Sequence, residues 1–348
     1  MSAPLRIDAQ LVGELGREDE AARRLKEVGF DGAFTFEGAH DVFFPLLTAA
    51  RAGTGLDLMT NVAIALPRSP IHLAHAAWDL QTISGGRFRL GLGSQVRTQI
   101  QRRYGSRWQS PVDQLREWVN ALRAIFGSWQ NGERLDFRGT YTTHTLMTPT
   151  FNPGPNPFGA PPILLGALGP RMTRLAAQVA DGVLVMPFNT EGHVRDRALP
   201  AIDAGLAAAG RPTRGSSDDR FEIVIEVIVC CGRNDAELAT AEAGVKALLG
   251  FYGSTPAYRS VLEGEGYDAL QPDLNAASKR GEWARMADMI DEGLLHRLAV
   301  HGTPAECARQ IHDRYGTIAT RLAVYQPYAA APETTAELLA ALRAGQET

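Results

Sequence analysis

The chain has 348 residues, of which 45% are apolar and 21% are charged, the composition of an ordinary globular protein. A net charge of −4, with Lys and Arg scattered along the chain, argues against binding to nucleic acid or to an anionic membrane. No stretch reaches the roughly 18 apolar residues of a membrane helix, and no targeting signal begins the sequence. We therefore expect a cytoplasmic protein whose partner is a small molecule.

Short runs rich in Val, Ile and Leu alternate with helical patterns along nearly the whole sequence. The predicted strands cover residues 6–12, 32–36, 57–64, 87–93, 162–167, 182–188, 221–231 and 320–327. Helices are expected between them, for example at 18–28, 70–83, 111–127, 170–180, 234–249 and 303–314. The repeated order implies a parallel sheet with helices outside. Eight such units predict one (β/α)8 TIM barrel domain over residues 1–348.

Two segments interrupt this alternation. Residues 130–161 contain a predicted hairpin, from Arg134 to Thr143, followed by a stretch rich in Pro and Gly. Residues 250–298 are polar and punctuated by glycines, with helical pieces such as 282–292. We interpret both as insertions on the barrel rim, because long insertions in a regular α/β protein tend to be functional.

The cysteines and histidines do not form a recognisable metal site. Cys230 and Cys231 are adjacent in an apolar run and Cys307 is far away, so no pair has metal-site or redox-motif spacing. His72 and His75 are three apart, which places them on one helix face, but no carboxylate cluster completes a ligand set. We predict buried, reduced thiols and no bound metal.

Barrel enzymes bind and catalyse in the loops that follow the carboxyl ends of their strands. In this sequence that rule selects residues 37–41, 61–68, 91–95, 166–171 and 187–189.

The loop after predicted strand 162–167 has the clearest chemistry. Gly166, Gly169 and Pro170 at the mouth of a helix leave backbone N–H groups free beside the positive end of the helix dipole, and Arg171 adds charge. These residues suit a phosphate. A tight turn that merely needs glycine explains them equally well, and the residues alone leave both interpretations open.

His40 lies between Glu37 and Asp41 in another of the selected loops. A neutral imidazole near pH 7 can move a proton, and a neighbouring carboxylate would fix its tautomer. The alternative is that His40 is an ordinary loop histidine without a catalytic role.

Gly91 and Gly93 resemble half of a dinucleotide-binding fingerprint, but close approach of a ligand or a neighbouring strand explains them more simply.

Segments along almost the entire chain resemble the luciferase-like monooxygenase superfamily, and within it the deazaflavin (F420)-dependent oxidoreductases. They are Gly29–Gly32, Glu37–Asp41, Asn61–Ile64, Pro70–Leu80, Ser84–Gly93, Gly166–Arg171, Ala180–Val183 and Gly302–Pro304. Each segment is moderately specific, and their order makes the resemblance strong.

The resemblance implies a cofactor whose tricyclic ring lies over the strand ends and whose phosphate lies in the 166–171 loop. The implied cofactor-binding residues are Asn61, Val62, Gly93, Ser94, Gln95, Gly166, Ala167, Leu168, Gly169, Pro170 and Arg171. The resemblance also implies a non-proline cis peptide bond between Asn61 and Val62, and a homodimer. His40 matches a histidine that moves a proton near the ring in several members, so His40, Glu37 and Asp41 form the predicted catalytic set.

Three functions remain after this comparison. The first is hydride transfer between F420 and a small, hydrophobic organic substrate. The second is an FMN-dependent monooxygenase that uses separately supplied reduced flavin and oxygen. The third is an inert flavin-binding barrel, which would have no need of an acid–histidine–acid loop. A deazaflavin has carbon at ring position 5 and carries hydride, whereas reduced FMN has nitrogen there and reacts with oxygen.

Overall fold

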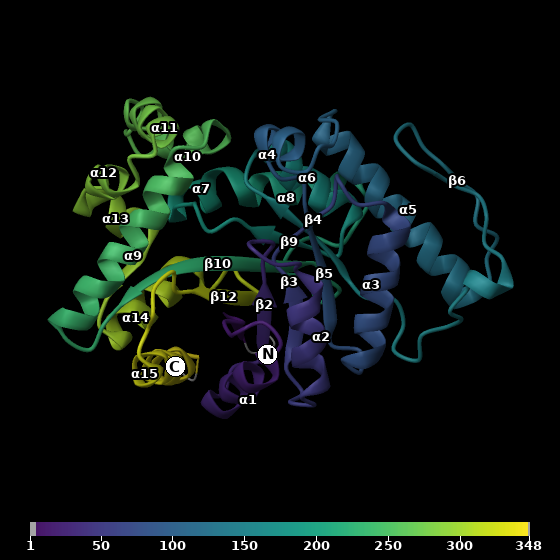
Figure 1. Cartoon of the computed structure of the whole chain (residues 1–348), viewed down its shortest axis with the longest axis horizontal. Helices are drawn as coiled ribbons and strands as arrows, with labels where there is room; N and C mark the ends of the chain where they lie inside the picture. Colours follow the sequence, from purple (N-terminus) through teal and green to yellow (C-terminus); the bar gives the residue numbers. More distant parts are fainter. Residues whose placement is uncertain (1–4, 347–348) are drawn as a thin grey trace. The chain divides into compact units, whose positions relative to one another are not determined.

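The computed structural model describes residues 5–346. Contacts divide the chain into two compact units. Within the described residues, the first unit contains 5–10, 185–200 and 223–346, and the second contains 11–184 and 201–222. Figure 1 shows the elements of both units in sequence colours.

The second unit is built on parallel strands in the order β2-β3-β5-β8-β9, with β4 beside β5. The strands are β2 (Gly32–Thr35), β3 (Asp57–Thr60), β4 (Ala63–Ile64), β5 (Phe88–Gly93), β8 (Ile163–Ala167) and β9 (Gly182–Val185). Its helices include α1 (Glu18–Val28), α2 (Phe43–Arg51), α3 (Pro70–Ile83), α4 (Arg97–Arg102), α5 (Pro111–Asn131), α6 (Pro170–Val179) and α8 (Leu199–Ala208). Helices α1, α2, α3, α5 and α6 pack in succession along the sheet. They cover its outer face.

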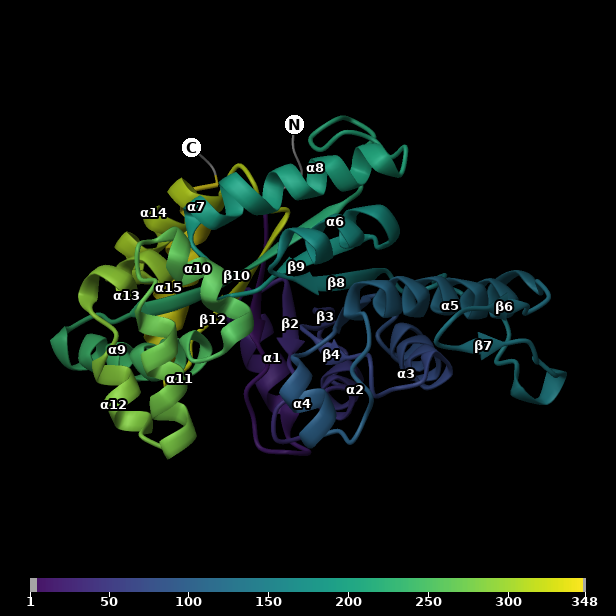
Figure 2. The same cartoon turned by 90° about the horizontal axis from the view of Figure 1, so that it is seen from above.

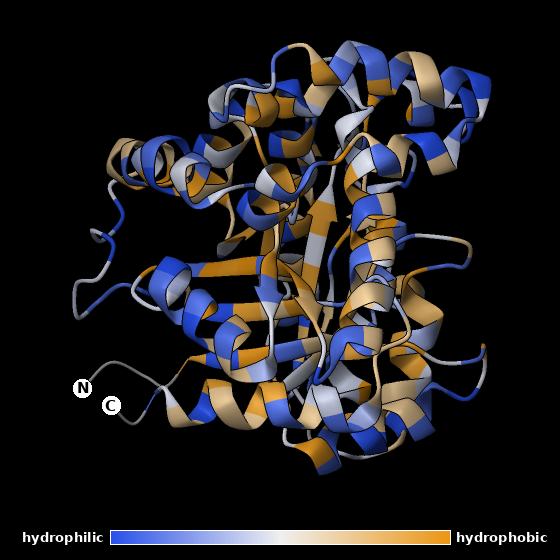
Figure 3. Cartoon of the chain, turned by 90° about the vertical axis from the view of Figure 1, so that its left-hand side faces the viewer, coloured by the Kyte–Doolittle hydropathy of each residue, from blue (hydrophilic) through white to orange (hydrophobic). Residues whose placement is uncertain are grey.

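Hydrophobic patterning explains these elements. The strand residues Phe34, Leu58, Leu90 and Leu164 are at most 2% exposed, as expected for parallel strands covered on both faces. Helix α5 buries one stripe of apolar residues and exposes the opposite face. Figure 3 shows the same contrast, with long orange runs on strands and alternating colours on helices.

The first predicted insertion leaves the regular pattern after α5. Strands β6 (Phe137–Arg138) and β7 (Thr143–His144) form the expected antiparallel hairpin, and the 3-10 helix η1 (Pro149–Phe151) follows. Figure 2 shows this segment beside the end of α5. Asn156, which is buried, returns the chain to the unit by donating to the carbonyl of Trp78 and the hydroxyl of Thr82.

The first unit has four parallel strands in the order β11-β10-β12-β1. They are β1 (Arg6–Gln10), β10 (Glu222–Cys231), β11 (Val300–Gly302) and β12 (Arg321–Tyr325). Asp8 of β1 and Arg321 of β12 form an ion pair of 2.6 Å with both side chains at most 2% exposed. The three cysteines are buried and free, as predicted.

The polar segment 250–298, in which helical pieces were expected, is nearly continuous helix. The helices of the first unit are α7 (Glu191–His193), the π-helix η2 (Val194–Ala198), α9 (Asp235–Gly253), η3 (Pro256–Tyr258), α10 (Arg259–Gly264), α11 (Leu270–Arg280), α12 (Trp283–Asp288), α13 (Glu292–Leu298), α14 (Pro304–Tyr315) and α15 (Pro332–Ala344). The single helix predicted at 282–292 is wrong. Asp291 accepts a hydrogen bond from the N–H of Leu294 and starts a separate helix there.

The repeated strand–helix order confirms the predicted (β/α)8-barrel class. Helices α1 and α3 match the predicted bounds to the residue. Every helix within residues 5–346 is too short or too polar to cross a lipid bilayer.

Candidate active site

Five strands of the second unit bring four of the loops selected from sequence to one edge. Thr35 is in register with Thr60, Ile64 with Gly93, and Leu92 with Leu165. Because the neighbouring strands β2, β3, β4, β5 and β8 run parallel, their carboxyl ends lie side by side. The loops after these strands therefore meet along the edge where barrel enzymes hold their active sites.

A bulge between β3 and β4 lies on this edge. The Asn61–Val62 peptide bond is cis, as the resemblance implied. A Cβ added to Gly93 would lie 2.5 Å from Cγ2 of Val62, and one added to Gly166 would lie 3.0 Å from its Cγ1. Val62 thus fills the space between the ends of β5 and β8. This space exists because Gly93 and Gly166 have no side chains. The fold brings these four predicted residues together.

Gly91 is explained by a neighbouring strand. A Cβ at this position would overlap the carbonyl oxygen of Thr60. The Thr60 hydroxyl donates to the Gly91 carbonyl at 2.7 Å and accepts from the Gly91 N–H at 2.9 Å. The close approach proposed for this glycine from sequence is confirmed, and no dinucleotide fingerprint is needed.

The loop after β8 leaves the amino end of α6 open. Gly169 is the N-cap and Pro170 the first helical residue, and a Cβ on Gly169 would meet no atom within 4 Å. The N–H of Arg171, in the first turn, has no acceptor within the helix. Its side chain is exposed and makes no polar contact with any residue in 5–346. Ala167 and Leu168 lead the chain into this turn.

Ser94 and Gln95 turn the chain after β5. The Ser94 hydroxyl donates to the Gln95 carbonyl at 3.1 Å, and the Gln95 side chain accepts from the N–H of Val96 at 2.9 Å. Gln95 has a φ of 59°, which is unusual for a residue with a side chain. Both side chains therefore support the local turn in this structure.

Glu37 is almost fully engaged by its neighbours, with its side chain 7% exposed. One carboxylate oxygen accepts from the N–H of Ile64 at 2.9 Å and from the guanidinium of Arg68. The other accepts from the hydroxyl of Tyr104 at 2.9 Å. Glu37 thereby ties the β2 loop to β4 and to the segment after β5.

Asp41 pairs with the same arginine. Arg68 donates to one Asp41 oxygen at 3.0 Å, while the other accepts from the N–H of Phe43 at 2.8 Å. Burial lowers the pKa of Arg68, but hydrogen bonds and charge from Glu37 and Asp41 outweigh burial and raise it. Burial, followed by the hydrogen bond and charge of Glu37, raises the pKa of Tyr104 to about 12. The cluster therefore keeps its arginine charged and its phenol neutral.

His40 is exposed, and its ring makes no polar contact with the residues between 5 and 346. The two carboxylates expected to fix its tautomer bind Arg68 instead. Its ring is left free to meet a ligand at the edge.

Arg68 and Tyr104 are the residues that sequence reasoning missed. Both contact Glu37 across more than 30 positions of the chain. Arg68 falls inside the selected stretch 61–68. The signal that could have identified it is the pair of carboxylates in the β2 loop, because half-buried carboxylates need a cation as partner.

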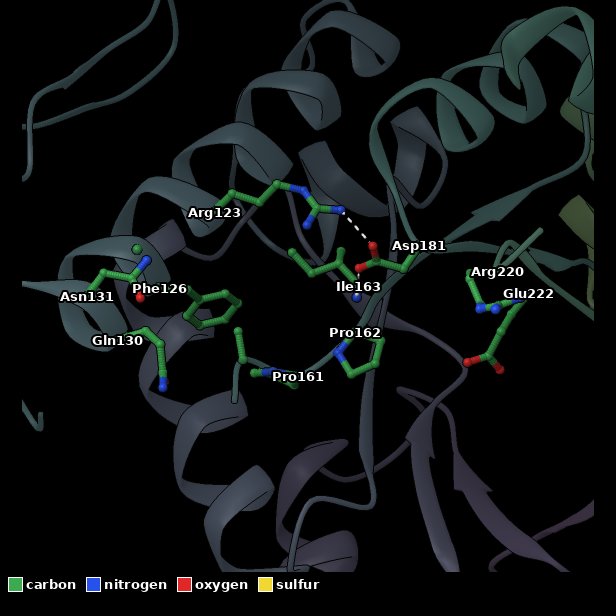
Figure 4. A pocket seen from close by; sticks show the side chains of 12 residues that line it. Arg123, Phe126, Gln130, Asn131, Pro161, Pro162, Ile163, Asp181, Arg220 and Glu222 are labelled. Atoms are coloured by element: carbon green, nitrogen blue, oxygen red, sulfur yellow. Dashed lines mark hydrogen bonds and ion pairs between the residues drawn. The ribbon is translucent and has the colours of Figure 1, made fainter. Parts of the chain in front are cut away.

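A cavity of about 520 Å³ lies elsewhere in the second unit. Figure 4 shows its lining, which includes Arg123, Phe126, Gln130, Pro161, Pro162, Ile163, Asp181, Arg220 and Glu222. Several of these residues stand at or just before the starts of β8, β9 and β10. Asp181 accepts from Arg123 at 3.0 Å and from the N–H of Ile163 at 2.8 Å. The cavity therefore belongs to the amino ends of the strands, opposite the loop edge.

Metal ligands are not gathered anywhere in the described part of the chain: no group of three or more His, Cys, Asp or Glu is placed to hold an ion.

The family model described as luciferase-like monooxygenase matches residues 3–321. The chain is 42% identical over 318 residues to "Uncharacterized protein Rv1360" of Mycobacterium tuberculosis, covering 91% of this chain and 92% of that protein. It is 29% identical over 249 residues to the 5,10-methylenetetrahydromethanopterin reductase of Archaeoglobus fulgidus, covering 70% and 69% of the two chains.

A solved structure shows the same fold. It is that of the coenzyme F420-dependent tetrahydromethanopterin reductase from Methanopyrus kandleri, with a TM-score of 0.79 and 19% identity. The similarity covers 97% of both chains.

Proposed function

The chain belongs to the luciferase-like monooxygenase family and is an F420- or FMN-dependent oxidoreductase, and from this premise we propose that its cofactor is F420. In this proposal it transfers hydride between the deazaflavin and a small, hydrophobic organic substrate. The proposal rests on one observation above all. An apolar bulge, an open helix amino end and a free histidine share one strand edge.

The bulge suits a flat ring. Val62 packs between Gly93 and Gly166, so the edge presents a compact apolar surface without projecting Cβ atoms. Asn61 lies at the same bulge and supplies an amide that can orient polar groups of the ring. Ser94 and Gln95 border this surface on β5.

The turn after β8 suits the cofactor's phosphate. The space beside Gly169 is open, the first turn of α6 offers the N–H of Arg171, and the guanidinium of Arg171 adds a positive charge. A ten-residue helix carries a partial positive charge at this end. Gly166, Ala167, Leu168 and Pro170 shape the turn that aims these donors.

His40 would hold and move the proton that accompanies hydride transfer. Bound F420 supplies a two-electron hydride carrier, and the chain's own residues orient the reactants and manage protons. The His40 ring is free to bind a substrate oxygen, and an imidazole can both accept and release a proton. Glu37 and Asp41 would act indirectly. Both pair with Arg68, and these ion pairs hold the loop that carries His40 in position.

An FMN-dependent monooxygenase is the second candidate, because FMN presents a ring and a phosphate to the same residues. A Mycobacterium tuberculosis relative named "Putative coenzyme F420-dependent oxidoreductase Rv3520c", 28% identical over 299 residues, favours F420. An FMN enzyme of this type would consume oxygen during turnover, whereas a hydride-transferring F420 enzyme would not.

Parallel binding titrations test the proposal. Purified protein is titrated with F420 and with FMN while fluorescence quenching is followed, and dissociation constants are compared under identical conditions. We expect micromolar or tighter binding of F420 and weaker binding of FMN. Binding of FMN alone would show the deazaflavin assignment to be wrong. No binding of either at micromolar concentration would contradict the cofactor site itself.

A further inference from the structure

The segment after β5 concentrates positive charge. Residues 97–107, here named the α4 arginine segment, contain Arg97, Arg102, Arg103 and Arg107. No Asp or Glu occurs from Ser94 to Ser110, whereas the chain as a whole carries a net charge of −4.

None of the four arginines forms an ion pair with the residues that the structure describes. Arg97 donates to the side chain of Gln101 at 3.2 Å, and Arg103 donates to the carbonyl of Gly38 at 2.6 Å. The side chains of Arg102 and Arg107 make no polar contact with residues 5–346 and are exposed.

Other exposed helices of this chain pair an arginine with a glutamate one turn away. Arg195 bonds to Glu191, and Arg259 bonds to Glu263, each at 2.7 Å. In α4 the corresponding partner of Arg97 is the neutral Gln101. Arg102, in the last turn of α4, can interact favourably with the helix dipole, but Arg97 is in the first turn, and Arg103 and Arg107 lie beyond the end of the helix. Three of the four charges therefore do not serve the stability of α4.

The segment is nevertheless held firmly at the site. Ile100 is fully buried, and Tyr104 donates its hydroxyl to Glu37. Arg103 reaches the loop that carries His40 through the carbonyl of Gly38. These anchors fix the backbone and leave the remaining arginines directed to solvent. In Figure 1, both α4 and α6 lie above the strands of the second unit.

The neighbouring strand carries the proposed phosphate turn. β5 pairs with β8, and parallel neighbours lie about 4.8 Å apart, so the turn at Gly169 and the segment after β5 follow adjacent strand ends. An anionic chain attached to a phosphate at the Gly169 turn would therefore pass the arginines of the α4 arginine segment.

We infer that the α4 arginine segment binds the polycarboxylate tail of the deazaflavin cofactor. F420 continues beyond its phosphate into a lactate and a chain of glutamates, each with a carboxylate, whereas FMN ends at its phosphate. Arginine recognises carboxylates by charge-assisted hydrogen bonds. This inference rests on the proposed function and extends it, because it makes the tail a determinant of the choice between the two cofactors.

The experiment compares three ligands. They are F420 with a tail of several glutamates, its tail-less and phosphate-free core FO, and FMN. The variant is Arg97→Gln/Arg102→Gln/Arg107→Gln, which spares the structural Arg103. We expect the dissociation constant of F420 to rise about tenfold or more at low salt, and those of FO and FMN, which both lack the tail, to stay within about twofold. Added salt should weaken F420 binding to the wild type more steeply than binding to the variant.

A control variant separates local from general charge effects. Arg51→Gln/Arg134→Gln/Arg309→Gln removes three exposed arginines that lie outside the segment, with the same change in net charge. It should leave F420 binding within about twofold.

Three results would overturn the inference. They are equal F420 affinity in the arginine variant and the wild type, an equal loss of FO binding in the arginine variant, and an equal loss of F420 binding in the control. In the first case, wild-type binding of F420 and FO would still support the proposed function. Absence of binding by all three ligands would overturn both.

Discussion

The two ends of the strands in the second unit differ in how their charges are satisfied. At the amino ends, Arg89 pairs with Asp57 and Glu222, and Arg123 pairs with Asp181. At the carboxyl ends, Arg68 pairs with Glu37 and Asp41, but the side chains of His40 and Arg171 make no polar contact within residues 5–346.

The cavity of about 520 Å³ lies at the amino ends, where its carboxylates, Asp181 and Glu222, are already paired with arginines. The chemistry that we propose lies at the other end, where the side chains of His40 and Arg171 are available to a ligand. Volume by itself therefore does not identify the active site in this architecture. The availability of charged and titratable groups is the better guide.

The largest expected effect that tests this contrast is on turnover. His40→Asn should lower turnover about 10²–10⁴-fold while F420 affinity is retained, because the amide cannot exchange a proton near neutral pH. Single-turnover reduction or oxidation of F420, followed by absorbance, measures this once a substrate is found. The exposed His72 provides the matched variant, His72→Asn, which should leave the rate unchanged. An unchanged rate in His40→Asn would remove His40 from the mechanism.

The next effect is on cofactor affinity. Gly169→Ala places a methyl group in the open space at the amino end of α6, so F420 and FMN should each bind about tenfold more weakly. Thermal unfolding should be nearly unchanged, because the added Cβ meets no protein atom. Gly264→Ala, which also adds a Cβ into open space, is the control. Unaltered binding by Gly169→Ala would place the phosphate elsewhere.

The third expected effect is on the free energy of unfolding, compared between one variant at each end of the strands. Glu37→Gln weakens a largely buried pair with Arg68 and should lower stability by about 2–3 kcal/mol. Asp181→Asn weakens a pair whose side chains are 45% and 37% exposed, and should cost only about 1 kcal/mol.

Urea unfolding of both variants measures the difference. Turnover should fall in Glu37→Gln, since the loop of His40 loosens, and stay normal in Asp181→Asn. The reverse order of turnover loss would move the active site to the amino ends.

The smallest effect is expected from filling the cavity. Ala160→Phe introduces a ring among the lining residues, where Ala160 is exposed. Stability should change by no more than about 0.5 kcal/mol, and F420 binding and turnover should stay within about twofold. Competitive loss of substrate binding in this variant would assign the cavity a role in the reaction.

Most of the fold was predictable because its signals are local. Helices α1 and α3 begin and end where predicted. Such local signals also include Thr303 and Glu306, which form a capping box three residues apart, and Gly85, which has a positive φ directly after α3. The helices between 250 and 298 were less predictable, because their glycines and polar residues read as interruptions while buried residues such as Leu274 and Leu294 hold the helices in place.

The sequence by itself determined the strand–helix order, and with it the loops that gather at the carboxyl ends. Those loops contain every residue of the proposed cofactor and catalytic sets. Only the tertiary structure decided the partners: Arg68 and Tyr104 for Glu37, and Val62 between Gly93 and Gly166. The reason is physical. Strand and helix signals come from neighbours along the chain, whereas side-chain pairing depends on the register between strands distant in sequence.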